Sequence, residues 1–387
     1  MKVKNCLDNN YAFLIMKIKK VAHKIIPYLS KELNGRKYWK TAATFLKEHP
    51  QPKLTKEEKK DIDRFWGRYN VKYPDYSWFE MYYGVTGIHD PRFIPHPVLI
   101  TICYPYYNSM VYGPGWDDKN VYERLTTSCE FPYSLCHCIN GKFYDHEWRF
   151  YNRNEIPNLT DKIFLDLGKD TDIICKDTCD TSFGKGVKKV VIGSIGEISD
   201  LLNQHKSKNF ILQKRIVQHP FFNQFNPTSA NIIRVISWRY EGVINILSAS
   251  IRFGMEGSFT DIAFVNGKEI ANVVGIDNDG YVKDRFVSLD GNSSNPPQIR
   301  EKKVPSWDKL IETVKKAHQD LLFFDFVAWD FMIDVKGDPI CIEYNIHWPG
   351  SVLYQYAHGP LAGEYTNKFL DFLKTAPSST IPVIFRK

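Results

Sequence analysis

The pattern of apolar and polar residues divides the chain into a helical first part and a strand-rich second part. Residues 11–34 place apolar side chains three or four apart with lysines between them, which predicts an amphipathic helix. Residues 35–95 are rich in lysine, tryptophan and tyrosine and predict further helices with long connections. The apolar run at 96–104 is typical of a strand, and 116–127 is typical of the start of a capped helix.

Strands dominate the remainder of the chain. Short apolar segments rich in β-branched residues predict strands at 171–177, 187–193, 209–216, 230–240 and 243–254. Helical periodicity predicts helices at 195–205 and 306–321. The composition of 290–297, "DGNSSNPP", is typical of a surface loop.

The last two strand-like segments, within "WDFMIDVKGDPICIEYNIHWPG" (residues 329–350), predict a hairpin that carries acidic side chains. If Lys336 and Gly337 are its two loop residues, Asp330 lies opposite Glu343; a shift of two residues places Asp330 opposite Asn345. In either register all three share one face, because side chains alternate along a strand. An opposite, apolar face is predicted for Phe331, Ile333, Ile340 and Ile342.

Such a face requires an explanation, because opposed carboxylates repel each other. A divalent cation relieves the repulsion, and a set of oxygen ligands favours Mg²⁺ or Mn²⁺ over zinc. The alternative is a hairpin whose acidic residues face solvent. The apolar residues of the other face favour a sheet that lines a cleft, and therefore a metal site.

Composition narrows the class of protein. The 387 residues are 43% hydrophobic, as in folded chains of up to three domains, and carry a net charge of +7. This modest excess fits a polyanionic small ligand or an acidic membrane surface and does not indicate nucleic-acid binding. The eight cysteines form no CxxC pair, and no apolar run reaches the ~18 residues that span a bilayer. We therefore expect a cytoplasmic protein.

The amphipathic helix at 11–34 leaves two alternatives open. A basic helix of this kind can lie on an anionic membrane, which would make the protein peripheral at the inner face. Packing of the helix on its own domain, with the lysines in solvent, is the commoner arrangement. We favour the second.

The hairpin also resembles a known structure. An acidic residue, a glutamate thirteen places on, an asparagine two further and a nearby Pro-Gly resemble the metal hairpin of the ATP-grasp superfamily. Five earlier segments resemble its other elements in the same order: "DDKN", "IICKDTCDTSFGKGV", "FILQKRIVQHP", "ANIIRVIS" and "SASIRFGMEGS". The pattern is most similar to the sugar-transfer-associated branch, which is found with genes for surface-polysaccharide synthesis. The resemblance covers about residues 117–363.

This resemblance implies an α+β fold in which two α+β subdomains clamp ATP, after a mainly helical N-terminal region. The implied N-terminal helical or substrate region is 1–115. Subdomain A, with the phosphate loop, spans 116–212, and subdomain B, with the hinge, arginines and metal hairpin, spans 213–375. Residues 376–387 form a tail.

The resemblance also implies roles for particular residues. The implied nucleotide contacts are Lys119, Lys176, Ser182, Gly184, Gly186, Gln213, Lys214 and Ile216. Stabilisation of the transferring phosphoryl group falls to two catalytic arginines, Arg234 and Arg252. The metal ligands are Asp330, Glu343 and Asn345. The implied cofactors are ATP and Mg²⁺ (or Mn²⁺).

Local alternatives accompany these roles. A helical lysine such as Lys119 is usually solvated, the glycine loop is equally typical of a plain turn, and buried arginines can form structural ion pairs. Gln213-Lys214 stands where many members carry a glutamate, and Ala328 where some carry an arginine. Additional candidates are substrate contacts by His347 and Asp261, and an acceptor pocket lined by Tyr354, Gln355 and His358.

The function implied is an ATP- and Mg²⁺-dependent ligase that joins a small carboxylic acid to an amine through an acylphosphate. Both substrates would be derived from sugars or amino acids, in capsule or O-antigen biosynthesis. One alternative is a kinase on the same scaffold that phosphorylates a sugar hydroxyl, with Asp261 or His347 as its base. The other is a non-catalytic nucleotide-binding assembly factor.

Overall fold

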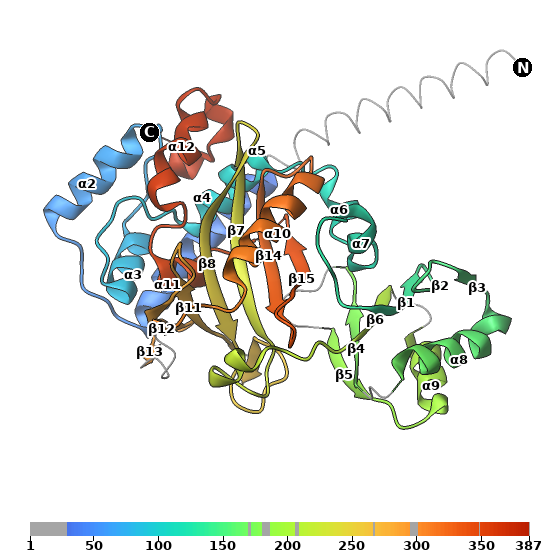
Figure 1. Cartoon of the computed structure of the whole chain (residues 1–387). Helices are drawn as coiled ribbons and strands as arrows, with labels where there is room; N and C mark the ends of the chain where they lie inside the picture. The colour runs from blue at the N-terminus through green and yellow to red at the C-terminus, as the bar shows by residue number, and fades with distance from the viewer. Residues whose placement is uncertain are drawn as a thin grey trace, which may run out of the picture. The chain divides into compact units, whose positions relative to one another are not determined.

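The computed structural model of the protein describes residues 29–168, 172–179, 186–205, 209–265, 268–294, 301–347 and 349–386. The chain forms two compact units (Figure 1). Unit 1 comprises Met1–Pro105 and Asn367–Lys387, and unit 2 comprises Tyr106–Thr366. The finer boundaries expected from the sequence, after residues 115, 212 and 375, stay predictions.

Unit 1 is helical, as expected for residues 35–95. Residues 29–48 form a helix; the rest of the predicted amphipathic helix, up to residue 28, lies outside the described residues. The other helices of the unit's N-terminal part are α2 (Lys56–Gly67), α3 (Ser77–Thr86), α4 (His96–Val98) and the π-helix η1 (Leu99–Cys103). Its C-terminal part has α12 (Thr366–Leu370), which begins at the boundary, then η6 (Asp371–Lys374), η7 (Ser378–Thr380) and η8 (Val383–Phe385).

Aromatic side chains build the core of unit 1. Trp39 stacks on Tyr73 with ring centroids 5.1 Å apart, and Trp39, Trp66 and Trp78 are all buried. The α2 helix begins at a capping box, in which Thr55 and Glu58 satisfy each other's backbone N–H groups. No helix within the described ranges is both long and apolar enough to cross a membrane.

The strand predicted at 96–104 is wrong. The segment is helical through α4 and η1 and continues into α5 (Tyr104–Tyr107). Its residues from Pro97 to Tyr104 are buried on all sides, so the run contains no periodicity that separates a helix from a strand. Pro97 in the first turn favours the helix, because proline lacks only an N–H group that has no partner there.

Unit 2 contains two large antiparallel sheets. The six-stranded sheet has the order β3-β2-β1-β6-β4-β5. Its strands are β1 (Ser134–Ile139), β2 (Lys142–Asp145), β3 (Phe150–Tyr151), β4 (Asp172–Asp177), β5 (Val187–Val191) and β6 (Phe210–Lys214). With the helices, this arrangement confirms the predicted α+β class.

The seven-stranded sheet has the order β13-β12-β11-β8-β7-β14-β15. Its strands are β7 (Asn231–Tyr240), β8 (Val243–Phe253), β11 (Asn272–Ile276), β12 (Val282–Ser288), β13 (Ser293–Ser294), β14 (Phe326–Ile333) and β15 (Pro339–Asn345). A separate two-stranded sheet pairs β9 (Ala263–Val265) with β10 (Lys268–Ile270). The strands predicted here are confirmed, but β13 interrupts the loop predicted at 290–297, whose last three residues lie outside the description.

One face of the six-stranded sheet packs in a core, and the other face is directed away from that core. Figure 1 shows α8 (Ile156–Leu167) and α9 (Ile195–His205) on one side of this sheet. Cys136, Cys175 and Leu212 pack into the core with these helices. Because strand side chains alternate, the residues that follow them, including Lys176 and Gln213, lie on the face away from α8 and α9.

The seven-stranded sheet also has one buried face, which packs on α10 (Trp307–Asp320). Ile233 and Ile251 belong to this core, so Arg234 and Arg252 lie on the opposite face. There α11 (Val352–His358) covers part of the sheet. Gly275 permits this close approach, because a Cβ atom at that position would lie 2.8 Å from the carbonyl oxygen of Ala357.

A β-bulge sets the register of the β14–β15 hairpin. Asp334 donates its N–H to the carbonyl of Asp338 (2.9 Å), so three residues form the loop, and the expectation of two is wrong. One extra residue, Ile342, bulges opposite the step from Asp330 to Phe331 and restores the predicted pairing of Asp330 with Glu343.

The bulge also reverses the predicted orientation of two β15 residues. Cys341, Tyr344 and Ile346 belong to the α10 core, as do Phe331 and Ile333. Ile340 instead pairs with Met332 on the other face, and Ile342 lines a pocket. The prediction is therefore wrong for both residues: the three-residue loop shifts Ile340 by one position, and the bulge turns Ile342 away from the core face.

Candidate functional site

Charged side chains form a row across four neighbouring strands of unit 2. Arg234 on β7 is in register with Asp330 on β14, and Asp330 is in register with Glu343 on β15. Arg252 lies two residues beyond the position of β8 that pairs with Arg234. All four belong to the sheet face opposite α10, so the alternation of the strands gathers charges that are far apart in sequence.

Arg234 and Asp330 form a buried, bidentate ion pair. The Nε of Arg234 donates to Oδ1 of Asp330, and one terminal nitrogen donates to Oδ2 at 2.7 Å. The other terminal nitrogen donates to the carbonyl of Pro349 at 2.7 Å. Burial disfavours the charged guanidinium, but Asp330 outweighs it and raises the pKa of Arg234. The structural ion pair considered as an alternative for this arginine is therefore present.

Arg252 joins this pair to two further groups. Its Nε donates to Asp261 and a terminal nitrogen contacts the hydroxyl of Tyr354, while the other terminal nitrogen lies 3.4 Å from Oδ2 of Asp330. The ring of Tyr354 also lies under the guanidinium of Arg234, 5.2 Å from its Cζ. Burial raises the pKa of Asp261, although Arg252 opposes the shift.

Glu343 is held more loosely than Asp330. Its Oε2 lies 3.4 Å from the ammonium of Lys119, and its Oε1 accepts from the amide of Asn345 at 3.4 Å. Burial opposes the charged carboxylate, but the nearby cations, Lys119 foremost, lower the pKa of Glu343. Both contacts are long for hydrogen bonds, so a ligand can replace them at little cost.

The three predicted metal ligands therefore share one surface. Within the described ranges no three His, Cys, Asp or Glu side chains gather as a metal site, so the third donor would be the amide of Asn345. All three groups offer oxygen, which fits a hard divalent cation such as Mg²⁺. Glu343 has weakly bound oxygens, whereas Asp330 is already engaged by two arginines.

Two lysines face this row. Lys176 on β4 is buried and makes no hydrogen bond or ion pair with the described residues. Burial lowers the pKa of Lys176 to about 8, against the attraction of Glu343. Burial also acts against the charge of Lys119, but Glu343 and Asp117 outweigh it and raise the pKa of that ammonium.

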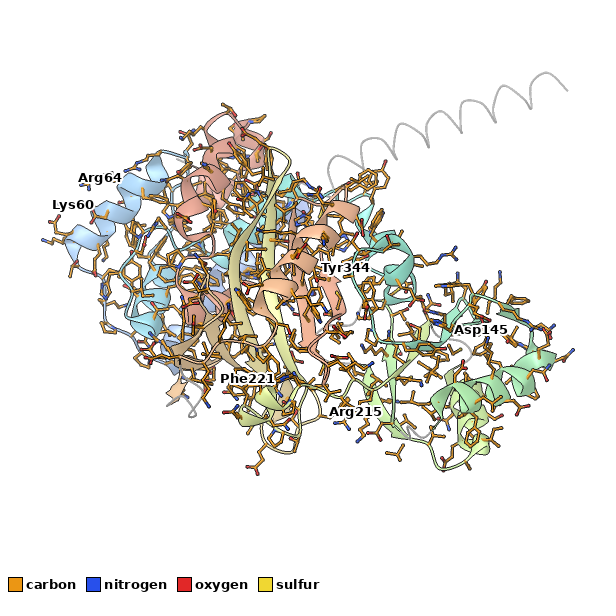
Figure 2. All side chains as sticks on the ribbon, viewed as in Figure 1. Lys60, Arg64, Asp145, Arg215, Phe221 and Tyr344 are labelled. Carbon is orange, nitrogen blue, oxygen red and sulfur yellow. The ribbon has the colours of Figure 1, made fainter. Side chains whose placement is uncertain are left out.

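Tyr344, labelled in Figure 2, fixes the segment that carries Lys119 to the large sheet. Its ring stacks on Tyr122 with centroids 4.1 Å apart, and its hydroxyl donates to the carbonyl of Trp116 (2.8 Å). The segment itself comprises α6 (Gly113–Trp116), η2 (Lys119–Val121) and α7 (Tyr122–Leu125). Asp118 caps η2, which confirms the capped helix start predicted at 116–127.

The predicted phosphate loop lies largely outside the description. Ser182 and Gly184 are not among the described residues, so their predicted roles rest on the sequence. Gly186 has a φ of 76°, and a Cβ atom there would lie 2.7 Å from Oδ2 of Asp177. Glycine is needed at this position for the turn itself.

The hinge residues predicted to hold adenine lie at and after the end of β6. Gln213 is buried, while Lys214 and Ile216 are half-buried. The backbone N–H of Lys214 donates to the carbonyl of Tyr133 at 2.9 Å. Arg215, labelled in Figure 2, pairs with Asp172 at 2.9 Å.

A small pocket connects these residues. It contains Gln213 from the smaller sheet, Ile342 from the larger sheet and Lys119 from η2. Its other lining residues are Tyr122, Glu123, Phe131 and Ser134. The sequence analysis did not select Glu123 or Ser134; the only local signal was the spacing of four between Lys119 and Glu123.

The additional candidates prove to be engaged within the fold. His347 Nδ1 lies 3.3 Å from Asp117, and a Cβ atom at Gly113 would lie 1.8 Å from its Nε2. His358 Nε2 contacts the carbonyl of Ile276 at 3.1 Å, and burial lowers the pKa of His358 to about 4. Gln355 is fully buried. Their predicted substrate contacts stay predictions.

Comparison with known proteins gives one family. The family model described as "Sugar-transfer associated ATP-grasp" matches residues 104–369. A search of curated proteins gives no match.

Several solved structures are similar in fold. VanG D-Ala:D-Ser ligase from Enterococcus faecalis is 11% identical with a TM-score of 0.41, over 66% of this chain and 60% of that one. D-alanyl-alanine synthetase A from Vibrio cholerae O1 biovar eltor is 13% identical with a TM-score of 0.39, over 66% and 61%. This chain therefore spans about three fifths of the length of these two proteins.

Proposed function

Because the chain belongs to the sugar-transfer associated ATP-grasp family, we propose that it is an ATP- and Mg²⁺-dependent ligase that joins a carboxylate to an amine. The family match confirms the resemblance found in the sequence and, with the two antiparallel sheets, the predicted ATP-grasp fold. The observation that carries the proposal is the row of Arg252, Arg234, Asp330 and Glu343, which faces Lys119 and Lys176.

The charge of this site suits a nucleotide triphosphate. Four cations, the buried Lys176, Arg234 and Arg252 and the half-buried Lys119, face three carboxylates, Asp261, Asp330 and Glu343. Most of this positive charge is buried, and a polyanion would relieve the cost of its burial. Lys176 supports this most directly, since burial lowers its pKa more than the attraction of Glu343 raises it.

Asp330, Glu343 and Asn345 are the residues proposed to hold Mg²⁺. When bound, the ion would neutralise part of the charge of the phosphates. Glu343 is ready for this role because its two contacts are long. Asp330 would hold the ion while it keeps Arg234 in place.

The proposed reaction has two steps. A substrate carboxylate attacks the γ-phosphorus of ATP, which releases ADP and gives an acylphosphate. An amine then attacks the acyl carbon, phosphate leaves, and the amine loses a proton as the amide forms. Arg234 and Arg252 would stabilise the negative charge that develops in both steps, and the chain supplies position and charge without a covalent nucleophile.

The contacts of His347 and Asp261 favour a ligase over a kinase. Phosphorylation of a hydroxyl calls for a protein base near the acceptor. His347 has its Nε2 packed against Gly113, and Asp261 is paired with Arg252. An amine that attacks an acylphosphate is itself the nucleophile and needs less help from the protein.

The family description supports a place in surface-polysaccharide assembly, such as capsule or O-antigen synthesis. The carboxylic acid and the amine would then derive from sugars or amino acids. We place the protein in the cytoplasm, where ATP is available. Contact of the basic helix predicted at 11–34 with the membrane is an extension of this proposal.

The test is product analysis. The whole chain is incubated with ATP, Mg²⁺ and pooled sugar acids and amines, and phosphate release and product masses are followed. We expect phosphate release that requires both an acid and an amine, with a product whose mass equals their sum less one water. A phosphorylated hydroxyl compound formed without amine would contradict the ligase and favour the kinase.

A further inference from the structure

Two neighbouring loops of unit 2 expose apolar side chains. The first comprises the end of α5 and the residues that follow it, and the second follows α10. Six of their residues, the apolar patch, are between 41% and 84% exposed: Tyr106, Met110, Val111, Tyr112, Leu322 and Phe323. Contiguous exposed apolar groups of this kind mark a binding surface, because folding has left them in contact with water.

Main-chain hydrogen bonds hold the two loops together. Ser109 donates its N–H to the carbonyl of Phe323, and Asp325 donates its N–H to the carbonyl of Tyr107, both at 3.0 Å. The ring of Tyr112 stacks on that of Phe323 with centroids 4.1 Å apart. The patch is therefore a surface formed before any partner arrives.

The apolar patch lies in two stretches without charge. Neither 104–116 nor 321–324 contains a charged residue. The carboxylates that border the second stretch are engaged within the fold, since Asp320 accepts two backbone N–H groups, at 2.9 and 3.0 Å, and Asp325 lies 3.0 Å from Arg239. The same holds for the two that follow the first stretch, Asp117 and Asp118.

Lysines lie beside the second loop. Lys315 and Lys316 are exposed near the end of α10, shortly before Leu322. Lys316 pairs with Glu312 at 2.7 Å, whereas Lys315 makes no ion pair with the described residues. Exposed basic groups beside an apolar surface suit anionic lipid, because the headgroup phosphates attract the lysines while the acyl chains accept the apolar groups.

The size of the patch favours lipid over a second copy of the chain. Side chains of this kind bury about 150–250 Å² each, so six that are roughly half exposed offer on the order of 600 Å². A stable protein–protein interface needs about 800 Å² from each partner. A membrane sets no such minimum, since a few inserted side chains act together with the attraction of charges.

The basic helix predicted at 11–34 supports the same partner. Leu29 belongs to its apolar stripe and Leu33 lies four residues later, and both are exposed in the helix at 29–48. These two residues belong to unit 1, so they are a feature separate from the apolar patch. An exposed apolar stripe in a lysine-rich helix is typical of contact with a membrane surface.

We propose that the apolar patch inserts into the surface of a membrane that contains anionic phospholipid, with Lys315 among the headgroups. Val111 and Leu322, the most exposed of the six, would enter the upper part of the acyl region. The hydroxyls of Tyr106 and Tyr112 would stay at the level of the headgroups, as tyrosines do at membrane surfaces. The proposal depends neither on ATP binding nor on the ligase reaction.

The experiment is sedimentation of the whole chain with vesicles of phosphatidylcholine and phosphatidylglycerol in a ratio of about two to one. We expect the wild-type chain to bind these vesicles, and to bind pure phosphatidylcholine more weakly. Val111→Asp should reduce binding about tenfold or more, because it replaces an apolar group with a charge that the headgroups repel. Val191→Asp makes the same change at an exposed valine on β5 and should bind like the wild type.

Two further variants separate lipid contact from damage to the fold. Val111→Trp should strengthen binding, because an indole ring is favoured at the membrane surface, whereas a misfolded variant would bind more weakly. Lys315→Gln should reduce binding to the mixed vesicles about fivefold and leave binding to pure phosphatidylcholine unchanged. Lys188→Gln, at an exposed position of β5, is its matched control.

The outcomes distinguish the possible partners. If the wild-type chain does not sediment with the mixed vesicles, the membrane proposal fails, whether or not the chain turns over ATP. If Val111→Asp and Leu322→Asp both bind as tightly as the wild type, the patch is contradicted and the contact belongs to another part of the chain. If the wild-type chain dimerises on gel filtration without vesicles and Val111→Asp is monomeric, the partner is a second copy and lipid is overturned.

Discussion

The two sheets of unit 2 differ in whether the buried charges on their facing surfaces are paired. On the seven-stranded sheet the charges compensate one another, since Arg234 is paired with Asp330 and Arg252 with Asp261. On the six-stranded sheet Lys176 is equally buried but has no ion-pair partner in the described part of the chain. The arginines of the first surface are therefore compensated within the fold, whereas the lysine of the second surface is not.

The difference indicates how the binding energy of a nucleotide is used. The paired arginines are held at fixed positions before ATP arrives, which favours a charge-stabilising role at the reacting phosphate. Burial disfavours the charged ammonium of Lys176. Contact with a phosphate would stabilise that charge and so offset the cost of its burial. The seven-stranded sheet would hold the arginines in position for the reaction, and the six-stranded sheet would contribute affinity for ATP.

The largest expected effect comes from Asp330→Ala. The variant loses a proposed metal ligand and leaves Arg234 and Arg252 without their shared partner. We expect ATP-dependent phosphate release to fall by about three orders of magnitude or more. The free energy of unfolding, measured with urea, should fall by about 3–5 kcal/mol, the usual cost of breaking a buried ion pair.

A double variant identifies the cause of the instability. Adding Arg234→Met to Asp330→Ala removes the uncompensated charge and should recover part of the lost free energy of unfolding, with no recovery of turnover. No recovery of stability would contradict the view that the two charges compensate each other.

Glu343→Gln should separate activity from stability. The contacts of Glu343 with Lys119 and Asn345 are both 3.4 Å long, so we expect the free energy of unfolding to change by less than about 1 kcal/mol. Turnover should still fall by about two orders of magnitude, because a proposed metal ligand loses its charge. A loss of stability equal to that of Asp330→Ala would remove the distinction between the two carboxylates.

Lys176→Met tests the other sheet. We expect the free energy of unfolding without nucleotide to rise by about 1–3 kcal/mol, because a buried charge is removed. ATP affinity, measured by calorimetry, should fall about tenfold to a hundredfold. Lys188→Met, an exposed position on the neighbouring strand, is the matched control and should change neither quantity. A less stable Lys176→Met would show that the lysine is compensated in the fold.

The lowered pKa of Lys176 also predicts a dependence on pH. In the free protein the pKa is about 8, against an ordinary value of 10.5, so between these values the unfolded chain binds more protons. The free energy of unfolding should therefore rise with pH through this window. Phosphate favours the charged ammonium, so ATP affinity should fall as the pH rises above about 8. Lys176→Arg stays charged and should lack that fall; an identical profile would assign it to another group.

The sequence predicted those elements whose patterns depend on neighbours along the chain. The shared face of Asp330, Glu343 and Asn345 followed from strand alternation, and the capped helix start at 116–127 from a capping pattern. The run at 96–104 failed because a segment buried on all sides has no periodicity. The bulge at Ile342 failed because it depends on how β15 packs against α10, which no local pattern records.

The residues of the candidate site also differ in whether a local sequence pattern could identify them. Arg234 and Arg252 were selected because their strands resemble those of the family, whereas their actual partners come from elsewhere in the fold. Glu123 and Ser134 were missed altogether, since α7 and β1 meet only through the folding of the smaller sheet. Tertiary contacts of this kind leave no spacing signal in one sequence.

The smallest expected effect concerns Tyr354, which joins the two arginines. Tyr354→Phe removes the hydroxyl that contacts Arg252 but keeps the ring under Arg234. We expect the free energy of unfolding to fall by about 1 kcal/mol and turnover to fall only a few-fold. Tyr354→Leu removes the ring as well and should cost more in both measurements, because the guanidinium of Arg234 then loses its aromatic contact. Equal effects of the two variants would mean that only the hydroxyl matters, and that the arginines are positioned by their carboxylates alone.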